Sequence, residues 1–182
     1  MTSAAPAALA FALLSVLGNP PRSVGQASAA PPILEFHGLE VGLPLADLRS
    51  RVRGLSGTLT CRPARDPRID ECTGSVRLDP RGRPYALIVS SIHDSAAVLI
   101  LNGTGTRDSA TAWADSIMKV QGRVTPRDRG QQRTWQWVRY RQMLRLIHRR
   151  DQPASVLTVT LTDGPLLDNL GAPIEARRQP PP

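Results

Sequence analysis

The chain of 182 residues contains two cysteines, Cys61 and Cys72, which could bind a metal, act in redox chemistry or form a disulfide. Structural zinc sites usually have closely spaced cysteine pairs, and no histidine or third cysteine lies near this pair in the sequence. A redox pair favours C-x-x-C spacing, which these cysteines do not have. In an oxidising compartment, a lone pair of cysteines is most simply a disulfide. We therefore predict a disulfide between them, and no bound metal or cofactor.

Residues 90–94, SSIHD, contain the side-chain types of a hydrolase. A nucleophile needs its base across space, however, and the G-x-S-x-G pattern is missing. The remaining histidines, His37 and His148, show no H-E-x-x-H or other metal-ligand spacing. We predict no catalytic residue, and a small hydrolase is only the second alternative to the binding functions considered below.

Residues 134–141, TWQWVRYR, form the remaining candidate site, because a strand would place their side chains alternately on two faces. If Val138 and Tyr140 point inward, the opposite face becomes an exposed stripe of the residue types that dominate protein–protein interfaces. In the alternative, both tryptophans pack under the second of two predicted helices, against Trp113. The candidate partner-binding stripe consists of Trp135, Trp137, Arg139 and Arg141.

The N-terminus has the pattern of a secretory signal peptide. Residues 7–18, AALAFALLSVLG, are an apolar run that is shorter than a membrane-spanning helix requires. Ala27-Ser28-Ala29 supplies small residues for signal peptidase, so cleavage is expected after Ala29. The alternative is an uncleaved N-terminal anchor. We predict a signal peptide at 1–29, a secreted or periplasmic product, and no transmembrane segment after cleavage.

The formal net charge of +8 comes almost wholly from arginine, since Lys119 is the only lysine. An exported protein with this charge meets anionic lipid head groups, acidic glycans or acidic protein surfaces before it meets nucleic acid. The composition therefore favours an envelope or protein partner and does not favour nucleic acid.

The first half of the chain reads as a short extended segment at 34–41, a helix and then antiparallel strands. Leu45, Leu48 and Val52 recur at helical spacing after Pro44. The strands that follow alternate with turns, of which DPRG at 79–82 has the strongest turn composition.

The second half repeats this order. A helix with Trp113 and Ile117 on one face begins with Asp108 or Ser109 as its cap and ends at Gly122. Strands follow at 134–141, 143–149 and 155–162, and Asp163-Gly164 makes the next turn. The first and second halves therefore share one plan.

The repeated plan predicts an α+β fold of two tandem units, each a helix packed on a three- or four-stranded antiparallel sheet. One such unit buries little apolar surface alone, whereas two can share a core or a sheet. The alternative is one antiparallel sheet whose two helices arose without duplication. The predicted organisation is a signal peptide at 1–29, a first unit with the disulfide at 30–103, a second unit at 104–170 and a disordered tail at 171–182.

Short segments of both halves resemble the SmpA/BamE-like family of outer-membrane assembly lipoproteins. GLPLADL at 42–48 is similar to the opening of that family's helix, and VQG at 120–122 to its end. WQW at 135–137 and LTVTLTDGPLLDNL at 157–170 look like its aromatic strand and final strand. Tandem copies of such a unit also resemble the β-lactamase inhibitor protein-like fold. The resemblance implies an extracytoplasmic module that binds another protein.

These observations predict a non-enzymatic protein-binding module whose partner is another extracytoplasmic protein. The alternative is a binder of anionic envelope polymers or lipid head groups through an arginine-rich surface. Salt separates the two, because binding to an anionic polymer weakens steeply with ionic strength, whereas binding to a protein responds modestly.

Overall fold

The computed structural model describes residues 33–150 and 154–171. The signal peptide predicted at 1–29 and residues 172–182 of the predicted tail lie outside this part of the chain. No helix within the described part combines the length and apolar character needed to cross a membrane. In chain order the elements are β1 (Glu35–Phe36), β2 (Leu39–Glu40), α1 (Leu45–Gly54), β3 (Thr58–Pro63), β4 (Ile69–Val76), β5 (Tyr85–Ile92), β6 (Ser95–Thr104), α2 (Arg107–Gln121), β7 (Arg127–Arg129), β8 (Gln132–Arg139), β9 (Gln142–Arg149), β10 (Val156–Asp163) and α3 (Gly164–Gly171).

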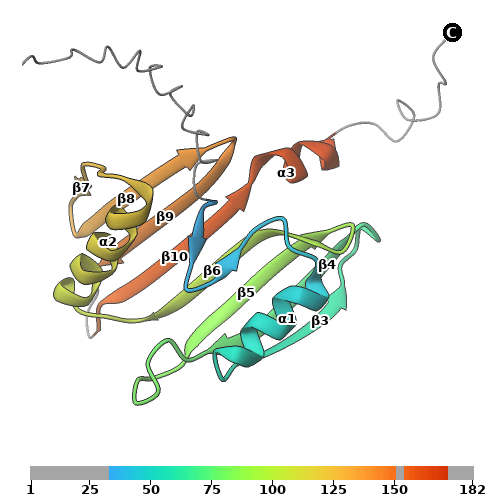
Figure 1. Ribbon diagram of the computed structural model, residues 1–182, viewed down its shortest axis with the longest axis horizontal. Coiled ribbons are helices and arrows are strands. Elements are labelled where there is room, and N and C mark those ends of the chain that lie inside the picture. Colours follow the sequence, from blue (N-terminus) through green and yellow to red (C-terminus); the bar gives the residue numbers. More distant parts are fainter. Residues whose placement is uncertain (1–32, 151–153, 172–182) are drawn as a thin grey trace, which may run out of the picture. The chain divides into compact units, whose positions relative to one another are not determined.

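Strands β3 to β10 form one antiparallel sheet in the order β3-β4-β5-β6-β10-β9-β8-β7 (Figure 1). Each half of the chain contributes four consecutive strands, and the halves join where β6 pairs with β10. Leu101 lies opposite Val159 in this pairing, and Leu99 lies opposite Leu161. Strands β1 and β2 pair with each other in a separate two-stranded sheet.

The predicted fold class, α+β with two tandem units that are each a helix packed on a three- or four-stranded antiparallel sheet, is wrong. The described residues are mostly β structure, with one eight-stranded sheet, one two-stranded sheet and three short helices. The physical reason lies in β6 and β10, whose inward side chains, apart from Asp163 at the end of β10, are apolar and fully buried. As edge strands they would expose unpaired backbone groups, and pairing with each other removes both edges.

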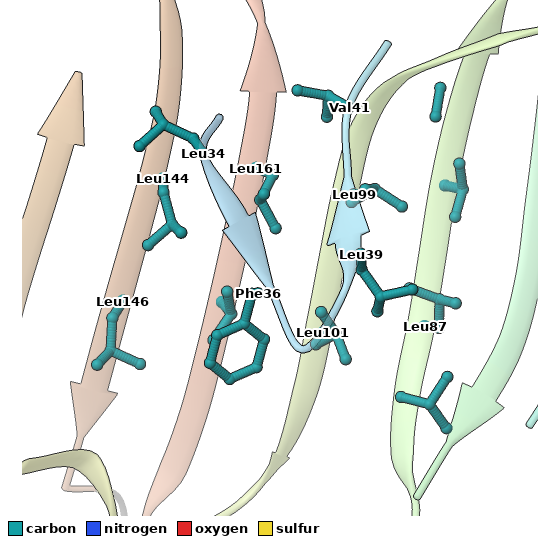
Figure 2. Packing of buried hydrophobic residues seen from close by; sticks show 14 of the residues in the cluster. Leu34, Phe36, Leu39, Val41, Leu87, Leu99, Leu101, Leu144, Leu146 and Leu161 are labelled. Atoms are coloured by element: carbon teal, nitrogen blue, oxygen red, sulfur yellow. The ribbon is translucent and has the colours of Figure 1, made fainter. Parts of the chain in front are cut away.

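The inner face of this sheet, defined here as the face that carries the core, is covered by α1, α2 and the β1–β2 hairpin. Figure 2 shows the hairpin lying over the inner face, with Leu34 and Phe36 on the side of β9 and β10, and Leu39 and Val41 on the side of β5 and β6. The inner-face side chains of the strands are almost fully buried in one cluster: Cys72, Val76, Leu87, Val89, Leu99, Leu101, Trp135, Trp137, Leu144, Leu146, Leu157, Val159 and Leu161.

Helix α1 confirms the predicted helical spacing, because Leu45, Leu48 and Val52 are its buried residues. The chain then turns sharply into β3 at Gly57. A Cβ at Gly57 would lie 2.2 Å from the carbonyl oxygen of Ser75, so this close approach requires glycine.

Helix α2 begins two residues earlier than Asp108, the nearer of its predicted caps, suggests. The side chain of Thr106 accepts a hydrogen bond from the Ser109 amide at 3.1 Å, so Thr106, and not Asp108 or Ser109, is the cap. Gly122 follows the helix with a φ of 87°, as its predicted role as helix stop requires.

The predicted disulfide between Cys61 and Cys72 is confirmed. The two residues lie directly opposite each other on β3 and β4, with their Cα atoms 3.9 Å apart. Strand β3 is an edge of the eight-stranded sheet. The disulfide therefore holds an edge strand to its only neighbour in the sheet.

The loop between β3 and β4 contains an ion pair between Asp66 and Arg68. Both carboxylate oxygens of Asp66 accept hydrogen bonds from the Arg68 guanidinium, the shortest at 2.7 Å. Hydrogen bonding to Arg68, from its side chain first and then its backbone amide, lowers the pKa of Asp66 to about 2.

This ion pair predicts a measurable titration. Because the folded pKa of Asp66 is depressed, its stabilising effect is present above the ordinary carboxyl pKa of 3.8 and is lost as the pH falls towards about 2. In an NMR titration of the side-chain carboxyl, Arg68→Ala should return the pKa of Asp66 towards 3.8. An unchanged pKa in this variant would contradict the ion pair as the cause.

Candidate functional site

The Trp/Arg stripe predicted as an exposed surface is buried at its tryptophans, which corrects that orientation. Trp135 and Trp137 are each 3% exposed on the inner face, whereas Val138 is 60% exposed and Tyr140 72% exposed. The structure therefore shows the alternative in which both tryptophans pack beneath the second helix. Trp113 does not meet them as that alternative assumed, because its ring lies against Phe36 and Tyr85, at centroid distances of 4.8 and 5.2 Å.

Polar groups of the predicted stripe hold neighbouring elements together. Trp137 Nε1 donates a hydrogen bond to the Gly122 carbonyl at 2.9 Å, and Arg139 donates to the carbonyl of the last residue of α2 at 2.6 Å. Arg141 forms an ion pair with Asp168 of α3. These contacts give the stripe a structural role within the fold.

The residues of the SSIHD segment are not brought together as a hydrolase would require. Ser91 is buried on the inner face, and its neighbour Ser90 belongs to the opposite face. His93 and Asp94 form the β5–β6 turn, with positive φ angles of 49° and 62°. In the described part of the chain, no group of three or more His, Cys, Asp or Glu side chains is arranged to hold a metal ion.

The opposite side of the eight-stranded sheet, called the outer face here, is the main candidate binding surface. The main cover of the sheet, α1, α2 and the hairpin, packs on the inner face, and α3 lies at the end of β10 beside β5, β6 and β9 (Figure 1). Ile88 of the outer face is 42% exposed and Val138 is 60% exposed. Directly opposed residues form a central row across seven strands: Thr60, Thr73, Ile88, Ile100, Thr160, Arg145 and Gln136.

The two halves of the outer face differ in charge. In the β3–β6 half, Arg62 pairs with Glu71 at 3.5 Å. In the β7–β10 half, no Asp or Glu of the described strands points outward, since Asp128 and Asp163 both belong to the inner face. The outward arginines of this half are Arg127, Arg129, Arg145 and Arg149. The result is a cationic surface among Thr, Gln, Ile and Val side chains.

Strand alternation could have revealed this surface from the sequence. The segment at 156–163, VLTVTLTD, alternates apolar inward residues with Val and Thr outward. What alternation does not show is which strands lie side by side. The outward arginines of β7 and β9 become one surface only because β8 pairs with both of these strands.

A second, smaller candidate is an aromatic depression between the hairpin and α2. Two pockets of about 310 and 350 Å³ share His37 and Trp113 as lining residues. Burial lowers the pKa of His37, and burial followed by the charge of Asp79 raises the pKa of Tyr85. The depression brings these rings together from segments that are far apart in the sequence.

Comparison with known proteins gave no match to a family model, to a curated protein or to a solved structure. The resemblance to SmpA/BamE-like modules therefore remains a prediction.

Proposed function

We propose that this protein is a non-enzymatic binding protein, secreted or periplasmic, that binds another extracytoplasmic protein through the outer face of its sheet. The disulfide supports this compartment, because such bonds form and persist in oxidising environments. The observation that carries the proposal is the β7–β10 half of the outer face, where the exposed Val138 and half-buried Thr, Ile and Val side chains lie among arginines and no Asp or Glu of the described strands points outward.

The chemistry of this surface specifies the kind of partner. Arginine is enriched among the residues that dominate protein interfaces, and Val138 and the half-buried Ile147 offer apolar contacts among the arginines. Side chains on a paired sheet are held in place, so less conformational entropy is lost on binding than for a loop. The partner should therefore present an apolar patch surrounded by Asp and Glu side chains.

Reversal of charge on the outer face should abolish partner binding. The variant Arg127→Glu with Arg145→Glu places like charges against an acidic partner. The amount of partner that it captures should be lower than for the wild type by a factor of about ten or more. The matched control, Arg49→Glu with Arg83→Glu, makes the same charge change at exposed arginines of α1 and the β4–β5 loop.

The measurement is capture from an extracytoplasmic extract by immobilised mature protein, followed by binding of the purified partner at low and high salt. Support requires one protein, acidic on its contact surface, that the wild type and the control retain and the outer-face variant loses. Equal recovery by all three proteins would reject the outer face as the binding surface.

The same arginines favour one competing function, adhesion to anionic lipid head groups or polymers. This function predicts that the wild type sediments with phosphatidylglycerol vesicles and that sedimentation is lost on raising the ionic strength. If the outer-face variant lost vesicle binding and no acidic protein partner were captured, the competing function would replace the proposed one.

A further inference from the structure

We propose that the protein binds a tetrahedral oxyanion, the phosphate or sulfate group of a small ligand, in a pocket between the start of α2 and the β7–β8 hairpin. This basic pocket has a volume of about 180 Å³. The charged and titratable groups that line it come from four elements and the segment after β9: Arg107, Asp128, Arg133, His148 and Arg150. The proposal concerns a different site from the outer face and does not depend on it.

His148 is the first observation that points to a ligand. Its side chain is buried, with 4% of the residue exposed, and Nε2 has no hydrogen-bond partner among the described residues. A buried polar atom without a partner destabilises a fold, so such atoms usually have one. When protonated, this nitrogen can donate to an anion held in the pocket.

The arginines are the second observation. Arg133 is neutralised by Asp128, whose two carboxylate oxygens accept hydrogen bonds of 2.8 and 2.7 Å from its guanidinium. Arg107 and Arg150 form no salt bridge within the described part of the chain, and the charge of Arg107 acts on Asp128 only at longer range. Arg107 is also the first residue of the 15-residue helix α2, so the positive end of the helix dipole lies at the pocket. Phosphate and sulfate suit such a site, because arginine donates two parallel hydrogen bonds to their oxygens.

The lowered pKa of His148 is consistent with a pocket that binds an anion. Burial is the largest cause that lowers the pKa of His148, and the charges of Arg150, Arg107 and Arg133 lower it further. A backbone hydrogen bond with Gly105 acts in the opposite direction. The pKa of the imidazole therefore lies below its ordinary value of 6.5 when no anion is bound, and a bound anion would raise it.

This linkage determines the pH dependence of binding. Because the anion raises the pKa of His148, the protein should bind the anion more tightly as the pH falls. The change should occur between the pKa of His148 with the anion bound and its pKa without the anion. Sulfate is the appropriate probe, since its own charge is constant there. Asp128 keeps its charge in this window, because hydrogen bonding to Arg133 lowers the pKa of its carboxyl.

The test is titration of the whole mature protein with sodium sulfate at about pH 5.5 and about pH 8, at constant ionic strength set with chloride. Calorimetry gives the affinity, and the NMR signals of the His148 ring report its protonation. We expect tighter sulfate binding at the lower pH and an upward shift of the His148 pKa at saturation. Inorganic phosphate and glycerol 3-phosphate then show whether the site takes a free anion only or also a phosphate that carries an organic group.

Two exposed positions allow variants that do not disturb the core. Arg107→Gln should weaken sulfate binding roughly tenfold, the loss expected for a charge-assisted hydrogen bond. Asp128→Asn removes the like charge and frees Arg133, so it should strengthen binding about threefold. Arg49→Gln, on α1, is the control and should bind as the wild type does. His148→Gln should remove the pH dependence.

Equal sulfate binding by the wild type, Arg107→Gln and Asp128→Asn would overturn the proposal, because sulfate would then not bind in this pocket. An equal loss of affinity in Arg107→Gln and Arg49→Gln would also overturn it, because sulfate would then act only through net charge. An affinity that did not change with pH, or an unmoved His148 pKa at saturation, would also overturn it.

Discussion

Trp137→Ala should lower the free energy of unfolding by about 3–5 kcal/mol, the loss typical of removing a large buried aromatic side chain. Trp137 is 3% exposed in the core cluster beneath α2. Its indole nitrogen also donates a hydrogen bond to the carbonyl of Gly122 at 2.9 Å. Alanine would therefore leave a cavity and remove the side-chain contact that ties β8 to the end of the helix. Urea denaturation followed by circular dichroism measures the effect.

The adjacent residue provides a control on the same strand. Val138 is 60% exposed on the outer face, so Val138→Ala should change the free energy of unfolding by less than about 1 kcal/mol. The pair of variants also tests the orientation of β8. If Val138→Ala were the more destabilising of the two, the valine face would be the buried one and the inner face would be wrongly assigned.

Removal of the disulfide should lower the free energy of unfolding by about 3 kcal/mol, on the loop-entropy estimate for cysteines separated by 11 residues. The suitable variant is Cys61→Ala with Cys72→Ala, since Cys72 is fully buried and a serine there would add an unpaired hydroxyl. Because β3 has one neighbour only, its hydrogen bonds with β4 should be the first to lose protection in hydrogen exchange.

A reducing agent separates this effect from the change of side chains. Dithiothreitol should destabilise the wild type and leave the double-alanine variant unaffected. If mass spectrometry found two free thiols in the mature protein isolated without a reducing agent, both the disulfide and the extracytoplasmic location that it supports would be rejected.

Local features of the fold are predictable from the sequence, because they depend on residues close together in the chain. The spacing of Leu45, Leu48 and Val52 predicts α1, and Gly122 predicts the end of α2. The lone cysteine pair predicts the disulfide. Even local prediction has gaps: residues 34–41 read as one extended segment, whereas His37 and Gly38, both with positive φ, turn them into the β1–β2 hairpin.

Long-range pairing decided the rest. The repeated order of helix and strands predicts two separate units, but the pairing of β6 with β10 merges all eight strands into one sheet. The strands of the units predicted at 30–103 and 104–170 therefore form one eight-stranded sheet and not two helix-on-sheet units. The alternation of apolar and polar residues identifies strands, but it does not predict which strands become neighbours in the sheet.

The candidate sites depend on the tertiary structure in the same way. In β8 both faces carry large side chains, so alternation predicts two faces without saying which is buried. The core beneath α2 has room for Trp135 and Trp137, and this leaves Val138 facing outward. Arg107 and His148, far apart in the chain, line one pocket only because α2 and β9 pack on each other. The sequence therefore determines local elements and the disulfide, whereas burial and strand pairing between distant segments determine the surfaces available for binding.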